Sequence, residues 1–175
     1  HIGTRVDIIT DASPWGLGGV LVVEGHISAY FACALDEHDV ARFKHALGES
    51  SGQQTWEALA MLVALRAWKE HWFDKCFCLT TESDSVSALT LLSKLKASGS
   101  GPNMVARELA LDLGDSAFKP SQFIHTPGVA NVLSDRLSRI CQPDSAYSVP
   151  ETLRDVPRTS VPIRISSFYR ATAKQ

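Results

Sequence analysis

A long apolar helix, predicted over residues 55–72, constrains the fold of this chain more than any other feature. Apolar side chains cover most of its circumference: one stripe runs through Trp56 and Leu59, and a second runs beside it through Met61 and Leu65. A helix that is apolar on nearly all sides is stable only when other elements cover it. We therefore expect this helix to be buried on two sides.

The stretches before and after this helix predict a mixed sheet. The first third of the chain reads as a meander of three strands, and helices and strands alternate after the long helix. The predicted strands are 5–10, 18–23, 27–34, 75–81 and 121–125, and the predicted helices are 40–46, 55–72, 85–96, 103–116 and 131–140. A meander followed by alternating elements is typical of an α/β fold with helices on the faces of a mixed sheet.

The pattern stops after Cys141. Residues 142–175 hold four of the eight prolines and show no hydrophobic periodicity, which is typical of an extended segment. The sequence therefore predicts a domain over residues 1–141, followed by a proline-rich arm over residues 142–175. We expect this arm to dock on its own domain or on a protein partner.

The remaining features of the chain favour an intracellular protein. No apolar run approaches the roughly 18 residues of a membrane span, and the chain, which begins with His1, lacks the pattern of a signal peptide. The cysteines have no zinc-site spacing and read as buried free thiols: Cys33, Cys76, Cys78 and Cys141. We expect a segment of a longer protein in a reducing compartment (cytoplasm, nucleus or an organelle), with no secretion.

The charge of the chain is unevenly distributed. The net charge is −2 overall, but residues 1–141 carry 12 Lys and Arg residues against 16 Asp and Glu residues, a net charge of −4. Residues 142–175 carry five against three, a net charge of +2. This balance excludes nucleic-acid binding by bulk positive charge alone. An acidic domain that handles a polyanion needs metal ions between itself and the phosphates.

Four acidic residues lie at the ends of predicted elements, and each has an ordinary structural explanation. Asp11 follows the first strand, where Asx-turns are common. Glu57 begins the long helix and suits its dipole, and Asp84 suits an N-cap. Asp135 precedes Arg139 by four residues, the spacing of a helical ion pair. Taken singly, each of these explanations is preferred.

The joint placement of these acids favours a metal site. In a mixed sheet Asp11 and Asp84 end neighbouring strands, Glu57 lies on the helix that crosses the sheet, and Asp135 lies on a helix that follows the last strand. Four converging carboxylates repel one another unless cations hold them, so without metal at least one of them should have a raised pKa. Carboxylate oxygens suit Mg²⁺ or Mn²⁺. Two such ions, roughly 3.5–4 Å apart, form the arrangement that cleaves phosphodiesters.

Four sequence motifs resemble those of the ribonuclease H domain, particularly the one attached to retrotransposon reverse transcriptases. In chain order they are D-I-I-T-D-A-S-P-W-G-L-G-G-V, T-W-E-A-L-A-M-L-V-A-L-R-A-W, L-T-T-E-S-D-S-V-S-A-L and H-T-P-G-V-A-N-V-L-S-D-R-L-S-R. The resemblance covers about residues 5–140, and the order of elements agrees with it. It implies an α/β ribonuclease H-like fold: a five-stranded mixed sheet, made of an antiparallel meander plus parallel strands, with helices on both faces.

The resemblance also implies roles for single residues. By their place in the motifs, the metal-binding catalytic carboxylates are Asp11, Glu57, Asp84 and Asp135, which hold two Mg²⁺ ions that Mn²⁺ can replace. His125 matches the loop histidine that assists catalysis or product release, and Asn131 matches the asparagine before the last Asp. The predicted substrate contacts are Asn131, Ser13, Ser85 and Trp15.

The function that the resemblance implies is an endonuclease that hydrolyses the RNA strand of RNA–DNA hybrids, as part of a retroelement reverse transcriptase. Residues 97–102 replace the basic protrusion of some free-standing members, so an attached or associated reverse transcriptase domain is the expected partner that holds the hybrid. Two alternatives stay open. The fold is shared by integrases, transposases, resolvases and exonucleases, and a retroelement-derived domain can serve as a structural subunit of a larger assembly.

Overall fold

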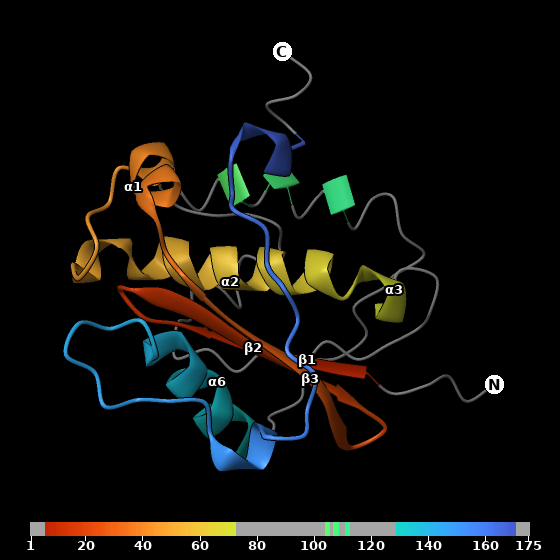
Figure 1. The fold of residues 1–175 in the computed structure, drawn as a ribbon. Coiled ribbons are helices and arrows are strands. Elements are labelled where there is room, and N and C mark those ends of the chain that lie inside the picture. Colours follow the sequence, from red (N-terminus) through yellow and green to blue (C-terminus); the bar gives the residue numbers. More distant parts are fainter. Residues whose placement is uncertain (1–5, 73–103, 106, 109–110, 113–128, 171–175) are drawn as a thin grey trace.

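The computed structural model of this chain describes residues 6–72, 104–105, 107–108, 111–112 and 129–170. Over these residues the fold is a mixed α/β structure in three layers (Figure 1). A three-stranded antiparallel sheet lies between helix α2 (Gln53–Ala67) on one face and helix α6 (Val129–Arg139) on the other. The coarse prediction of an α/β fold with helices on both faces is confirmed, whereas the five-stranded ribonuclease H-like sheet stays a prediction.

The sheet is the predicted meander, in the order β1-β2-β3. Its strands are β1 (Val6–Ala12), β2 (Gly16–Val23) and β3 (His26–Ala34). Both residues of the turn between β2 and β3 have positive φ, 49° at Glu24 and 79° at Gly25, which suits the tight twist of a two-residue hairpin. The first two strands extend beyond their predicted ends because Asp11 pairs with Gly18 and Ala12 pairs with Leu17 across the ladder.

The long apolar helix is buried as predicted, but it is interrupted. Every residue from 55 to 65 is buried, and the helix packs on the strand face that carries Ile8, Leu21 and Phe31. Trp68 ends α2, and a short helix, α3 (Lys69–Trp72), follows it. The indole N–H of Trp68 donates to Thr159 Oγ1 over 2.9 Å, so a contact with the distant arm holds the residue at which the helix breaks.

Helix α1 (Glu37–Phe43) begins three residues earlier than its predicted start at residue 40. The reason is a capping box, in which the Asp36 carboxylate accepts from the backbone N–H of Asp39 while the Asp39 carboxylate accepts from that of Asp36. Lys44 ends this helix in the left-handed conformation, with a φ of 58°. A single turn of 3₁₀ helix, η1 (Ser50–Gly52), leads from this region into α2.

Helix α6 packs closely on β2 because two glycines of the strand face it. A Cβ atom on Gly18 would lie 2.6 Å from the carbonyl oxygen of Ser134 and 2.7 Å from the backbone nitrogen of Ser138. A Cβ atom on Gly16 would lie 2.8 Å from the carbonyl oxygen of Ser138. The missing side chains therefore let the backbones of strand and helix touch. Val20 of β2, with Leu133 and Leu137 of α6, fills the rest of this layer.

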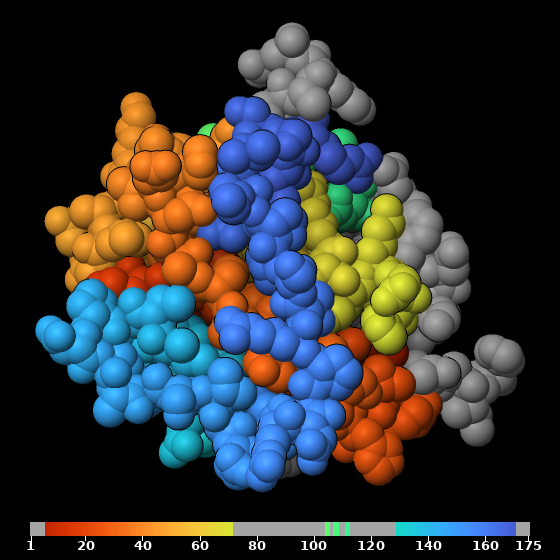
Figure 2. Space-filling model, in the orientation of Figure 1, coloured from red at the N-terminus to blue at the C-terminus, as the bar shows by residue number. Residues whose placement is uncertain are grey.

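The arm packs on its own domain. The Tyr30 backbone N–H donates to the Pro157 carbonyl over 3.2 Å, and the Thr159 N–H donates to the Tyr30 carbonyl over 2.7 Å, so the arm runs along the outer edge of β3. It then crosses towards α1 and α2 as a blue band in Figure 2. Two 3₁₀ turns, η2 (Glu151–Leu153) and η3 (Ser166–Phe168), are its regular structure in the described part of the chain. The Tyr169 side chain at its end is fully buried in the α2 core.

Several predictions concern residues outside the described ranges. The predicted strands 75–81 and 121–125 and the predicted helix 85–96 lie there, as do Cys76 and Cys78. The predicted helix 103–116 is described at six positions between residues 104 and 112, and all six are helical. Within the residues that the structure describes, no helix has both the length and the apolar character needed to cross a membrane.

The two described cysteines are free thiols in different surroundings. Cys33 on β3 is half-buried, and burial raises the pKa of its thiol to about 11. Cys141 is exposed, so the prediction that it is buried is wrong. The reason is its place just after the end of α6, where the chain leaves the sheet.

Candidate functional site

Three of the four predicted acids lie together at one end of β1, and each comes from a different element. They are Asp11 near the end of β1, Glu57 in the first turns of α2, and Asp135 on α6. Burial raises the pKa of Asp11 to about 7; the N–H of Ala12, which donates to its carboxylate, acts in the opposite direction, and the charges of Asp135 and Glu57 add to the increase. The expectation that one of the clustered acids has a raised pKa is confirmed at Asp11. Asp84 lies outside the described residues.

The close packing of α6 on β2 brings Asp135 to Asp11. Asp11 is the cross-strand partner of Gly18, and directly opposite residues of an antiparallel pair point to the same face of the sheet. Gly18 is also the point where Ser134 and Ser138, on either side of Asp135, touch the strand. The carboxyl groups of Asp11 and Asp135 are consequently close neighbours, and the charge of Asp135 contributes to the raised pKa of Asp11.

Gln53, which is not among the predicted site residues, holds the Glu57 side chain in place. Its Nε2 donates to the backbone carbonyl of Ala12 over 2.7 Å and to Glu57 Oε1 over 3.0 Å. It thereby ties the end of β1 to the acid on α2, whose side chain is only 4% exposed. The signal available in the sequence was the spacing of Gln53 and Glu57, four residues apart on one face of a helix.

Asp135 also has the ion-pair partner that its spacing predicted. Arg139 Nε lies 3.0 Å from Asp135 Oδ1, and the two side chains are 39% and 43% exposed. The pKa of Arg139 is raised, with the hydrogen bond to Asp135 as the largest cause. Asp135 therefore lies between a cation, Arg139, on one side and the Asp11 carboxyl group on the other.

The chemistry of this acid cluster, defined as Asp11, Glu57 and Asp135, suits a hard divalent cation. Its donors are carboxylate oxygens, the ligands that Mg²⁺ and Mn²⁺ prefer. In the ranges that the structure describes, no group of three or more His, Cys, Asp or Glu side chains is arranged as a metal site. A metal site completed by Asp84 stays a prediction.

Three other predicted site residues, Ser13, Trp15 and Asn131, lie within the described part of the chain. Ser13 is buried, and its hydroxyl donates to the Ser138 carbonyl over 2.6 Å and accepts from the N–H groups of Trp15 and Gly16. Trp15 is half-buried beside Gly48, and Asn131 lies in the first turns of α6. These contacts give Ser13 a structural role in joining β1 to α6, while the substrate contacts of all three residues stay predictions. Ser85 and His125 lie outside the described residues.

None of the protein-family models and none of the curated proteins matches this chain. The case for a function therefore depends on the motifs in the sequence and on the geometry of the acid cluster.

Proposed function

We propose that this chain is a metal-dependent endonuclease that hydrolyses the RNA strand of RNA–DNA hybrids, as part of a retroelement reverse transcriptase. The observation that carries the proposal is the meeting of Asp11, Glu57 and Asp135 from three separate elements. Like charges held close together destabilise a fold, and groups with strongly shifted pKa values are concentrated at functional sites. The four motifs and their order support the same reaction.

In this proposal Asp11, Glu57, Asp84 and Asp135 hold two Mg²⁺ ions, which Mn²⁺ can replace. The bound ions would supply an activated water and stabilise the leaving oxygen of the phosphodiester. Gln53 holds the Glu57 carboxylate towards the end of β1, and Arg139 orients that of Asp135. His125 is proposed to assist catalysis or product release.

The proposed substrate is recognised by its shape and its 2′-hydroxyl groups rather than by its base sequence. Asn131, Ser13, Ser85 and Trp15 are the proposed contacts. Residues 1–141 carry a net charge of −4, so little affinity for the hybrid comes from counterion release. The isolated chain should bind weakly, and an attached or associated reverse transcriptase domain would raise the effective concentration of the substrate.

Cleavage of a labelled RNA–DNA hybrid in Mg²⁺ and in Mn²⁺ tests the proposal. The chain is fused to a generic hybrid-binding module and compared with Asp11→Asn and Asp84→Asn variants of the same fusion. Both substitutions are nearly isosteric, so the fold should survive while turnover falls by at least a hundredfold. A matched Asp155→Asn variant, which changes an exposed acid on the arm, should keep the parent rate.

Equal rates for the parent and the Asp11→Asn fusion would exclude Asp11 as a catalytic ligand. If the parent fusion cleaves nothing in either metal, the endonuclease proposal is wrong and the structural-subunit alternative takes its place. Cleavage of double-stranded DNA in preference to the hybrid would assign the chain to another activity of the same fold class.

A further inference from the structure

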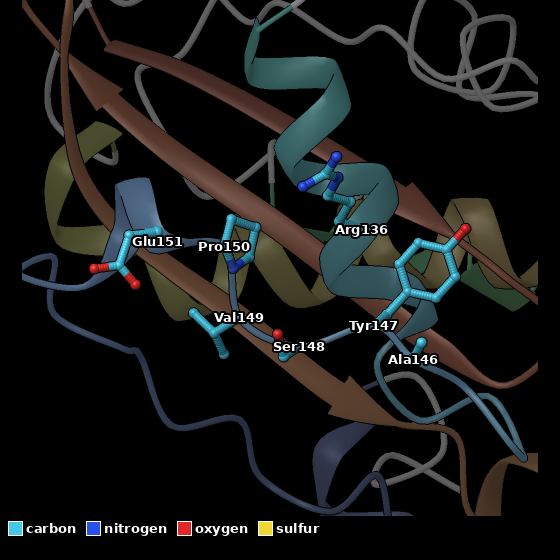
Figure 3. A pocket seen from close by; sticks show the side chains of 7 residues that line it. All are labelled: Arg136, Ala146, Tyr147, Ser148, Val149, Pro150 and Glu151. Carbon is cyan, nitrogen blue, oxygen red and sulfur yellow. The ribbon is translucent and has the colours of Figure 1, made fainter.

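A pocket of about 410 Å³ lies between α6 and the first part of the arm. Figure 3 shows the Arg136 side chain projecting from α6, the Tyr147 ring beside the same helix, and residues 148–151 running past them. Arg136, Tyr147 and Ser148 supply its polar groups, and Val149 and Pro150 supply apolar walls. The volume falls in the range of small-ligand sites.

Among the described residues, no acid forms an ion pair with Arg136, the cation that lines this pocket. Arg136 is exposed and makes no ion pair or hydrogen bond within the part of the chain that the structure describes. The neighbouring cation, Arg139, is already paired with Asp135. Glu151 lines the pocket too, but its carboxylate lies 3.3 Å from the Arg154 guanidinium, which offsets its charge. The pocket therefore presents one free guanidinium to an anion.

The second feature of the pocket is an accessible aromatic ring. Tyr147 is 45% exposed, on an arm segment whose other side is tied down by buried Pro150 and Leu153. A guanidinium binds phosphate oxygens through paired N–H groups, and a flat aromatic ring stacks on a nucleobase of any sequence. A phosphate and a base joined by one sugar match this pair of groups.

We propose that the pocket between α6 and residues 146–151 binds one nucleotide of a single-stranded nucleic acid, with the phosphate on Arg136 and the base against Tyr147. Arg136 directly follows Asp135 of the acid cluster along α6, so one helix carries a residue of the pocket and a residue of the cluster. The choice of a nucleic acid as the occupant rests on the proposed function. The binding itself needs neither metal nor cleavage.

The test is a fluorescence anisotropy titration of a labelled ten-nucleotide oligoadenylate RNA with the full chain, in EDTA and at low salt. Arg136→Ala and Tyr147→Leu should each weaken binding by at least fivefold, while Tyr147→Phe, which keeps the ring, should bind like the parent. The matched control is Arg107→Ala, which removes an exposed arginine near the α2 side of the sheet. It should change the dissociation constant by less than twofold.

Equal losses in Arg136→Ala and Arg107→Ala would overturn the proposal, because binding would then depend on charge alone. Unchanged binding in Tyr147→Leu would overturn the stacking contact and with it the nucleotide assignment. The absence of oligonucleotide binding by the parent chain would also overturn it, and the adjoining surface of Val129 and Val132 would then favour an apolar protein segment as the occupant. Intact pocket binding combined with no hybrid cleavage would contradict the proposed function and leave this pocket standing.

Discussion

At the scale of the residue, the Asp11 carboxyl links the stability of the fold to pH. Its pKa is raised from 3.8 to about 7 by burial and by the neighbouring acids, so the folded chain binds a proton that the unfolded chain releases. The stabilisation of the folded state that comes from this bound proton is fully present below pH 3.8 and is lost as the pH rises towards 7. Above pH 7 the folded state has to hold Asp11 charged beside Asp135 and Glu57, with Arg139 as a compensating cation.

We therefore predict that Asp11→Asn raises the melting temperature at pH 8 and leaves it nearly unchanged at pH 4. The amide cannot ionise, so the variant avoids the repulsion that grows between these two pH values. Thermal denaturation in EDTA at several pH values measures the difference from the parent chain. Asp155→Asn, at an exposed position, should follow the parent curve, and a parallel curve for Asp11→Asn would contradict the prediction.

Divalent cations should reverse the destabilisation at high pH. A cation that binds the folded acid cluster and not the unfolded chain stabilises the fold by mass action. We predict that Mg²⁺ raises the melting temperature of the parent chain at pH 8 and has a much smaller effect on Asp11→Asn. A melting temperature that does not change over a wide range of Mg²⁺ concentration would count against a metal site.

At the scale of the element, the contact between β2 and α6 positions the acid cluster. Gly18 has no room for a Cβ atom, because the nearest atoms are backbone atoms of α6 that cannot rotate away. A substitution here has to push the helix off the strand. Since Asp135 lies on that helix and Asp11 lies opposite Gly18, the same displacement separates the two carboxyl groups.

We predict that Gly18→Ala destabilises the fold by about 1–3 kcal/mol, as overpacking in a tight interior does. It should also lower the pKa of Asp11 towards its ordinary value, because Asp135 moves away. Urea denaturation measures the first effect, and a carboxyl NMR titration measures the second. Gly25→Asn is the control, since a Cβ there meets nothing within 4 Å and asparagine tolerates a positive φ.

At the scale of the whole molecule, the arm is part of the packed structure. Arg164 of the arm forms an ion pair with Asp39 of α1 at 2.6 Å, and the two side chains are 2% and 0% exposed. Its guanidinium also donates to the Ala34 carbonyl at the end of β3. Further along, the Phe168 carbonyl accepts from Arg66 of α2. The arm thereby joins α1, β3 and α2 in one network.

Arg164→Ala should destabilise the chain by about 3–5 kcal/mol, because it leaves the Asp39 charge buried without a partner. The double variant Asp39→Asn with Arg164→Met should recover part of this loss, since it leaves no unpaired charge. Chemical denaturation measures both variants. Arg154→Ala, which removes a cation from an exposed pair on the same arm, should cost no more than about 1 kcal/mol; an equal cost for the two alanine variants would contradict a structural arm.

Local patterns were enough to predict the elements. Hydrophobic periodicity and turn residues predict the buried helix over 55–65, the three strands and helix α6. These signals act between residues only a few positions apart along the chain, so the sequence alone carries them. The extra turn of α1 also has a local cause, the capping box of Asp36 and Asp39, whereas the hydrophobic pattern alone predicts a start at residue 40. The break at Trp68 could not be predicted, since it involves Thr159 of the arm.

For the candidate site, the sequence by itself determined which residues carry carboxylates and that Asp11, Glu57 and Asp135 lie on a strand and two helices. Only the tertiary structure decided that Asp135 lies close enough to Asp11 to raise its pKa, that Gln53 holds Glu57, and that Gly16 and Gly18 admit α6 so closely. It also decided that the proline-rich arm is bound to its own domain through Arg164 and Tyr169. The physical reason is that each of these contacts joins groups that are distant along the chain, or depends on how closely two backbones approach. Tertiary packing sets both, and the local sequence does not encode them.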